Sequence, residues 1–93
     1  MSENIIRAAA DGDLETVKKL IREGDDVNSR DNGRWSPLIL AAQNGHLDVV
    51  KFLIDHGADI NAENAYTETA LCLAKSDGHV EIVAILEKLG AKP

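Results

Sequence analysis

The sequence predicts an all-α solenoid of three antiparallel helix pairs, joined by two β-hairpin-like fingers. The first observation is a period of 33 residues: residues 44–61 realign with residues 11–28, and residues 76–93 fall on the same grid. The second is that apolar residues within each repeat follow a helical spacing until a glycine interrupts them. A fixed period of this length is typical of stacked arrays, in which each unit covers the apolar face of its neighbour.

Glycines and aliphatic residues hold the same position in successive repeats. We therefore expect a single domain, residues 1–93, with repeats at about 1–33, 34–66 and 67–93. The aligned sets are Gly12, Gly45 and Gly78; Leu14, Leu47 and Val80; Val17, Val50 and Val83; Leu20, Leu53 and Leu86; and Gly24, Gly57 and Gly90.

Local signals in the middle repeat predict each helix. A short helix is expected to begin at Pro37, which suits a first helical turn and follows Ser36, a suitable cap. A longer helix is expected to begin at Leu47 and to end before the cap glycine Gly57. The intervening residues 44–46 are too few for anything except an antiparallel helical hairpin.

Between the helix pairs the sequence is polar. Residues 25–35 and 58–68 are rich in Asn, Asp and Gly, which suit extended turns. We call these segments finger 1 and finger 2. Each repeat is thus expected to contain a short helix, a longer helix and a protruding finger.

Composition limits the classes of function. No stretch approaches the roughly 18 uninterrupted apolar residues of a membrane span, and residues 1–4 lack the features of a secretory signal. The net charge of −6 disfavours nucleic acid and anionic lipid as partners. Cys72 is the only cysteine, which agrees with a reducing, cytoplasmic location. We expect a monomer.

Several short motifs resemble those of the ankyrin repeat. Residues 57–61 are similar to its Gly-Ala-Asp-Val-Asn motif, residues 36–38 to its Thr-Pro-Leu motif, and residues 44–47 to its Gly-His-Leu joint. The resemblance covers essentially the whole chain, in three copies. The tetratricopeptide repeat is the nearest rival, but it lacks a glycine-terminated second helix followed by a long polar finger.

The chain departs from the family pattern at several positions, among them the polar clasp and the finger turn. Ile39 and Cys72 replace a histidine that bonds back to the threonine of the motif, so this polar clasp is absent. The glycine of the finger turn aligns with Arg34 and Thr67. Because a β-branched residue resists a positive φ, finger 2 is expected to turn differently or to store strain, while Gly33 could replace the turn glycine in finger 1.

Polar and charged residues replace apolar stacking residues at both ends of the array. Terminal repeats require this to stay soluble, so we expect a complete, capped array. The end residues are Thr16 and Lys19 in the first repeat, and Glu87 and Lys88 in the last.

The last repeat departs from the family pattern at two further positions, because Ala70 replaces a proline and Lys75 replaces an alanine. Both changes should loosen this repeat, so we expect it to open first.

The sequence offers little for catalysis. His46 and His79 occupy the same joint in successive repeats, which favours bonds to the neighbouring backbone over acid–base chemistry. His56 is expected to interact with the carbonyl end of a helix. Cys72 aligns with Ile39, which predicts a buried and therefore inert thiol. Metal and phosphate-binding motifs are absent from the sequence, so neither an enzyme nor a cofactor is expected.

Trp35 and Tyr66 are the only Trp and Tyr residues, and both are expected near finger tips. Such residues are enriched in binding hot spots. The alternative is that they pack on each other or on the finger stems, shielding Val27 and Ile60. In the family that the chain resembles, recognition uses the finger tips and the concave face of the short helices. This implies a contact set of Arg30, Asn32, Arg34, Trp35, Gln43, Asn44, Glu63, Tyr66, Glu68, Ser76 and Asp77.

The sequence is thus interpreted as a rigid, non-catalytic module that binds another protein. Two alternatives stay open. One is an idealised array without an evolved partner, whose charged surface serves solubility; the other is a regulator that occludes the active site of a specific enzyme. The resemblance also leaves open hydroxylation of Asn28 or Asn61.

Overall fold

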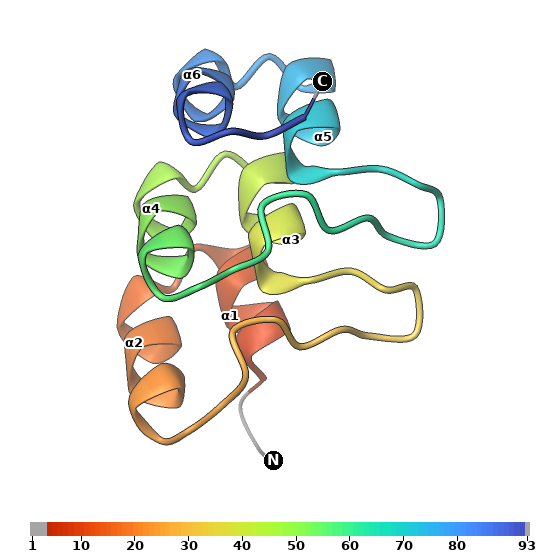
Figure 1. Ribbon diagram of the computed structural model, residues 1–93. Helices are drawn as coiled ribbons and strands as arrows, with labels where there is room; N and C mark the ends of the chain where they lie inside the picture. Colours follow the sequence, from red (N-terminus) through yellow and green to blue (C-terminus); the bar gives the residue numbers. More distant parts are fainter. Residues whose placement is uncertain (1–3, 93) are drawn as a thin grey trace.

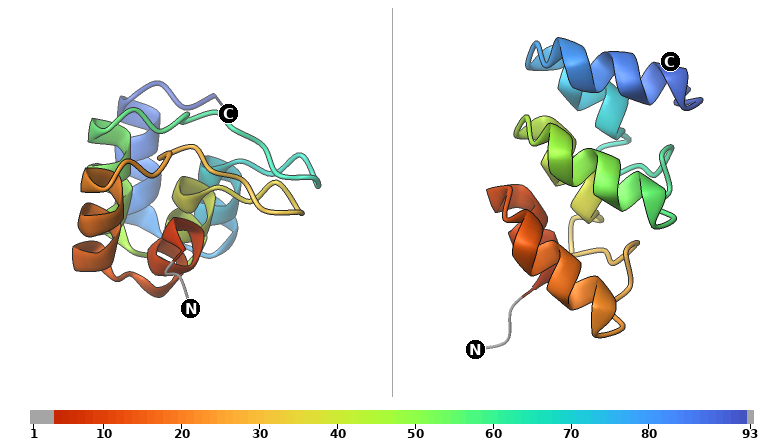
Figure 2. Two further views of the ribbon diagram at one scale, coloured as in Figure 1. Left: turned by 90° about the horizontal axis from the view of Figure 1, so that it is seen from below. Right: turned by 90° about the vertical axis from the view of Figure 1, so that its left-hand side faces the viewer.

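The computed structural model describes residues 4–92, and this range contains six α-helices in three antiparallel pairs (Figure 1). The first helices of the pairs form one layer and the second helices another, so that the pairs stack in a row (Figures 1 and 2). The predicted helical repeat is confirmed. Residues 1–3 and 93 of the expected domain, including most of the segment considered for a secretory signal, lie outside the described residues. The helices are α1 (Ile5–Asp11), α2 (Leu14–Arg22), α3 (Pro37–Gln43), α4 (Leu47–Asp55), α5 (Ala70–Ser76) and α6 (Val80–Lys88).

The short helices α3 and α5 begin at matching caps. The Ser36 hydroxyl accepts a hydrogen bond from the backbone N–H of Ile39 at 3.2 Å, and the Thr69 hydroxyl accepts one from that of Cys72 at 3.1 Å. Pro37 occupies the first turn of α3, as predicted. These caps satisfy N–H groups that have no partner within the helix. Both helices therefore start at the same position of the repeat.

A continuous aliphatic core joins the three repeats. Leu20, Leu53 and Leu86 belong to it, with exposed fractions of 6%, 0% and 0%. Fully burying such a side chain contributes about 1.5–3 kcal/mol. Ala41 and Ala74 on the short helices are also completely buried, and their small size lets these helices pack closely. Burial between repeats therefore fixes how the helix pairs are oriented, and with them the direction in which the fingers project.

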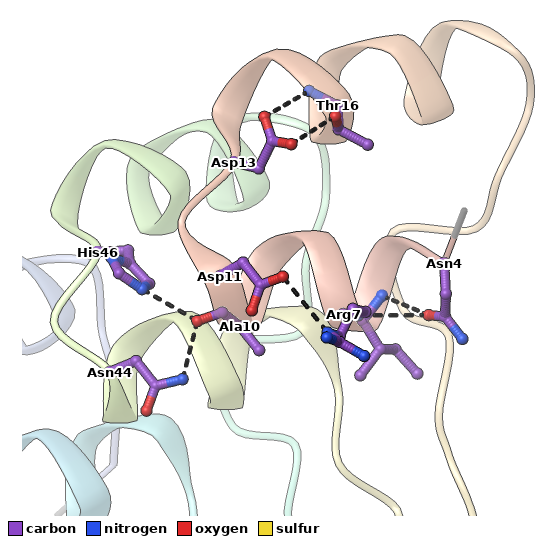
Figure 3. A network of polar contacts seen from close by, with 9 residues as sticks. Asn4, Arg7, Ala10, Asp11, Asp13, Thr16, Asn44 and His46 are labelled. Carbon is purple, nitrogen blue, oxygen red and sulfur yellow. Dashed lines mark hydrogen bonds and ion pairs between the residues drawn. The ribbon is translucent and has the colours of Figure 1, made fainter.

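Each helix joint is tied to the joint before it. His46 Nε2 lies 3.0 Å from the carbonyl oxygen of Ala10, and Asn44 Nδ2 donates to the same oxygen at 2.9 Å (Figure 3). His79 Nε2 lies 2.8 Å from the carbonyl oxygen of Gln43. Since a carbonyl only accepts, each imidazole donates through Nε2. The predicted backbone contacts of both histidines are confirmed.

His56 lies at the carbonyl end of α4. Its Nδ1 is 2.9 Å from the carbonyl oxygen of Phe52, and the two rings stack with centroids 4.0 Å apart. This confirms the predicted contact. All three histidines of the chain thus take part in structural contacts.

The side chains expected to cap the array are half-buried or exposed. In the first repeat Thr16 is half-buried and Lys19 is exposed, and in the last repeat Glu87 and Lys88 are exposed. Lys75 Nζ lies 3.6 Å from Glu87 Oε2, which links α5 to α6 across the end of the stack. An exposed ion pair of this kind adds little stability.

The predicted burial of Cys72 is wrong, because its side chain is exposed. Ile39, which aligns with it, is only 1% exposed. Ile39 is covered by Ala62 of finger 2 and Leu73 of α5. Within the described residues, no later repeat covers Cys72 in the same way. The alignment therefore identified the equivalent helix position but not the neighbour that buries it.

The two fingers project from the same side of the stack, one above the other (Figure 1). No β-strand occurs between residues 4 and 92, so the predicted β-hairpin character is not confirmed. Each finger instead closes through a tight turn at its tip. The hydrogen bonds that make these turns define the candidate site.

Candidate functional site

Finger 1 is closed by a carboxylate that imitates a backbone turn. Asp31 Oδ1 accepts hydrogen bonds from the N–H groups of Gly33 at 3.0 Å and Trp35 at 2.9 Å. In the backbone, Asp31 N–H donates to the Trp35 carbonyl at 3.2 Å, and Arg34 N–H donates to the Asp31 carbonyl at 2.9 Å. Aspartate suits this position because its short side chain reaches the N–H two residues onward. The tip of finger 1 is fixed as a result.

Finger 2 repeats the same turn with asparagine. Asn64 Oδ1 accepts from the N–H groups of Tyr66 at 2.8 Å and Glu68 at 3.0 Å, and Asn64 Nδ2 donates to Glu68 Oε1 at 2.9 Å. Asn64 is only 3% exposed, and a buried amide requires such partners. Sequence reasoning missed Asp31 and Asn64 as turn formers. The signal was present, since they are short acceptor side chains one repeat apart.

Both tips contain a non-glycine residue in the left-handed region. Arg34 has a φ of 63° and Thr67 a φ of 61°. Finger 2 therefore does not turn differently from finger 1, and the expected strain at Thr67 is the alternative that holds. The expectation that Gly33 replaces the turn glycine is wrong, because Arg34 itself takes the positive φ. The side-chain turns of Asp31 and Asn64 bracket these residues and hold them there.

Hydrogen bonds tie the fingers to each other. Arg30 Nη1 donates to the carbonyl oxygens of Arg34 at 3.0 Å and Glu63 at 2.8 Å, and Ala65 N–H donates to the Gly33 carbonyl at 2.8 Å. Bonds from a guanidinium are stronger than neutral ones. The Arg30 guanidinium is thus engaged within the protein. The two tips form one unit.

The two aromatic residues differ in their surroundings. Trp35 is half-buried and packs against the cluster formed by Ile39, Ala62 and Leu73. Tyr66 is 72% exposed. The alternative in which the aromatic residue packs on the protein therefore applies to Trp35. It packs on the cluster that contains Ile39, whereas Val27 and Ile60 pack on the main core. Tyr66 presents its ring to solvent at the tip of finger 2.

The predicted contact set divides into two groups. The side chains of the first group form hydrogen bonds or packing contacts within the protein: Arg30, Trp35, Asn44 and Glu68. The other side chains form no hydrogen bond or ion pair with residues 4–92, and of these Asn32, Arg34, Glu63, Tyr66, Ser76 and Asp77 are exposed and Gln43 is half-buried.

A shallow depression of about 580 Å³ lies between finger 2 and α5. It brings together Glu63 and Ser76 from the predicted set with Leu71, Cys72 and Lys75. Its lining mixes the apolar Leu71 with polar and charged side chains and it is open to solvent, which suits contact with a peptide or side chain more than an enclosed small molecule. Sequence reasoning missed Cys72 here, because it predicted a buried thiol.

No group of three metal-ligating side chains is present in residues 4–92. Asp13 caps α2 (Figure 3), where hydrogen bonds from the Thr16 hydroxyl at 2.6 Å and the Thr16 N–H at 3.2 Å hold the pKa of its carboxyl below the ordinary value of 3.8. None of the helices between residues 4 and 92 has the length and apolar character to cross a membrane.

The stacked helix pairs and projecting fingers define a helical repeat protein. A family profile described as ankyrin repeats, in three copies, matches residues 5–93. The chain belongs to the ankyrin-repeat family, whose members are generally protein–protein interaction modules and typically non-catalytic. A comparison with curated proteins found no significant match.

Proposed function

We propose that the chain binds another protein through the tips of fingers 1 and 2 and the adjoining face of the short helices. The observation that carries the proposal is the exposure of Tyr66 and Arg34 on turns that the protein fixes with its own hydrogen bonds. The bond from Ala65 N–H to the Gly33 carbonyl brings the two tips together. Tyr66 supplies apolar area and a hydroxyl, and Arg34 supplies a positive charge.

Rigidity supports this function. Asp31 and Asn64 fix the turns, and Arg30 links them, before any partner arrives. A surface that is ordered in advance loses less conformational entropy on association. Two finger tips and the adjoining helix ends, with Ser76 and Asp77, offer a surface on the scale of a standard interface of about 800 Å² per partner.

The proposal includes a monomer in the cytoplasm. Charge on the terminal faces, as at Lys75 and Glu87, opposes end-to-end stacking of copies. The net charge of −6 opposes binding to nucleic acid or anionic membranes. A partner enzyme whose active site is occluded would use the same surface.

The test is a comparison of Tyr66→Ala and Arg34→Ala with the wild type. Mass spectrometry would identify the proteins that the wild-type chain enriches from cell extract and that a variant with both substitutions does not. The purified partner would then be titrated against each variant by isothermal calorimetry. Tyr66→Ala should raise Kd by about tenfold or more, as expected for an aromatic hot spot.

Lys51→Ala is the matched control, since Lys51 is exposed on α4, in the other layer of helices. It should leave Kd unchanged, and all variants should keep the wild-type melting temperature. Trp35 is a poor probe because its ring also packs within the protein. Equal Kd values for Tyr66→Ala and Lys51→Ala would place the binding surface elsewhere and refute the proposal.

A further inference from the structure

The chain contains two Asn-Gly pairs, and the structure treats them differently. Asn32-Gly33 lies at the tip of finger 1, and Asn44-Gly45 lies at the end of α3. In an Asn-Gly pair the backbone nitrogen of glycine can attack the side-chain carbon Cγ of the asparagine before it and close a five-membered ring. Glycine has no side chain to hinder this approach. Both pairs thus carry the same intrinsic reactivity.

Asn32 contributes no hydrogen bond to the turn that its neighbours fix. It is exposed, and neither its backbone nor its carboxamide makes a hydrogen bond with residues 4–92. Its carboxamide is free to rotate toward the nitrogen of Gly33. One contact opposes the reaction, because the Gly33 N–H donates to Asp31 Oδ1 at 3.0 Å.

Asn44 is held at three points. Its Nδ2 donates to the Ala10 carbonyl at 2.9 Å, and its backbone N–H donates to the Leu40 carbonyl at 3.0 Å. The Gly45 N–H donates to the Ala42 carbonyl at 3.3 Å. The bond to Ala10 crosses between repeats (Figure 3), so freeing this carboxamide disturbs the stack.

We propose that Asn32 is a site of spontaneous deamidation and that the fold protects Asn44. The Gly33 nitrogen gives its proton to a base in solvent and attacks Cγ of Asn32, and the side-chain nitrogen departs as ammonia. Water then opens the resulting succinimide at either carbonyl and leaves aspartate or isoaspartate. No oxidant or reductant takes part.

The product alters finger 1 without touching the helical core. Either product adds a negative charge beside Asp31, and isoaspartate also lengthens the backbone by one methylene within a hydrogen-bonded turn. The Gly33 carbonyl, which accepts from Ala65 N–H, follows directly in the chain. Finger 1 therefore changes with age, whether or not the proposed partner surface is correct.

Trypsin allows the two sites to be read separately. It cleaves after Arg30, Arg34 and Lys51, which leaves Asn32 in residues 31–34 and Asn44 in residues 35–51. The folded protein would be incubated in mildly alkaline buffer at physiological temperature, and both peptides would be quantified by chromatography and mass spectrometry. Conversion at Asn32 should be faster than at Asn44 by about tenfold or more, since more hydrogen bonds must break at Asn44.

Two controls assign the difference to the structure. In concentrated urea both sites should convert at similar rates. Asn32→Gln should abolish conversion in residues 31–34, because glutamine must close a larger ring. The proposal is overturned if Asn32 in the folded protein stays intact while the unfolded chain converts, if both sites convert equally in the folded protein, or if Asn44 lags equally in urea.

Discussion

Arg34 and Thr67 adopt backbone conformations that glycine adopts more easily. Both have a φ close to 60° and both are exposed, so their side chains contribute little packing. In Thr67 the hydroxyl donates to the Tyr66 carbonyl at 2.6 Å, which offsets only part of the steric cost. The hydrogen bonds of Asp31 and Asn64 hold these conformations in place. Strain at an exposed tip is consistent with a role in recognition.

Replacing Thr67 with glycine should therefore stabilise the protein. The change removes about 1–2 kcal/mol of steric cost, but it costs about 0.5–1 kcal/mol of backbone entropy and also removes the Thr67 hydroxyl bond to the Tyr66 carbonyl. The free energy of unfolding should therefore rise by up to about 1 kcal/mol. Urea denaturation measures the difference. Asn32→Gly is the control, because Asn32 lies in the same kind of turn without a positive φ. If both variants lose stability equally, the tips are not strained.

Among the elements, the helix joints depend on glycine for two separate reasons. Gly45 has a φ of 81°, and a Cβ there would meet His79 Cε1 at 2.8 Å. Gly78 has a φ of 74°, but a Cβ there would meet nothing within 4 Å. The joint between α3 and α4 needs glycine at position 45 both for its backbone conformation and for space. The joint between α5 and α6 needs glycine at position 78 for its backbone conformation alone.

Gly45→Ala should accordingly destabilise the protein more than Gly78→Ala. The unfavourable φ costs about 1–2 kcal/mol at each position. At Gly45 the His79 ring must also move and lose its bond to the Gln43 carbonyl, which adds about 1–3 kcal/mol. Urea denaturation of the two variants compares them directly. Equal losses would mean that the ring moves without cost.

The cap of α2 makes stability depend on pH. Hydrogen bonds from Thr16 lower the pKa of Asp13 in the folded state, so the unfolded chain binds more protons in the window between the two pKa values. The cap's contribution is present above the ordinary pKa of 3.8 and is lost as the pH falls through the lowered, folded value. Asp13→Asn keeps an acceptor without this titration. The stability difference between wild type and Asp13→Asn should shrink as the solution is acidified, and a constant difference would contradict this role.

The sequence predicted the helices better than the fingers, for a physical reason. Pro37 and Gly57 mark helix ends through local backbone constraints, which act in any context. The turn at Arg34 depends on four hydrogen bonds made by Asp31 within a folded finger, and propensity favoured Gly33 instead. The burial of Cys72 was mispredicted because it depends on whether a neighbouring repeat covers the side chain, and the position of the residue within its own repeat does not determine this.

For the whole molecule, stability is a sum over repeats and the contacts between neighbours. The middle repeat is covered on both sides, since α3 packs against α1 and α5. In the described residues, α5 and α6 are covered on one side only, and they carry an exposed Cys72 and Lys75 where α3 has buried residues. We therefore expect the last repeat to open before the others. Hydrogen exchange should be fastest in α5 and α6, and faster exchange in α1 and α2 would contradict this order.

Ala70→Pro should stabilise this last repeat selectively. Ala70 is the first residue of α5 and aligns with Pro37, and Thr69 before it has the extended conformation that a following proline requires, with φ −103° and ψ 168°. Proline at a compatible site contributes about 0.4–1 kcal/mol by restricting the unfolded chain. Exchange in α5 and α6 should slow relative to α1 and α2, whereas Pro37→Ala should speed exchange in the middle repeat. Slower exchange in every helix after Ala70→Pro would show that the array opens as one unit and not repeat by repeat.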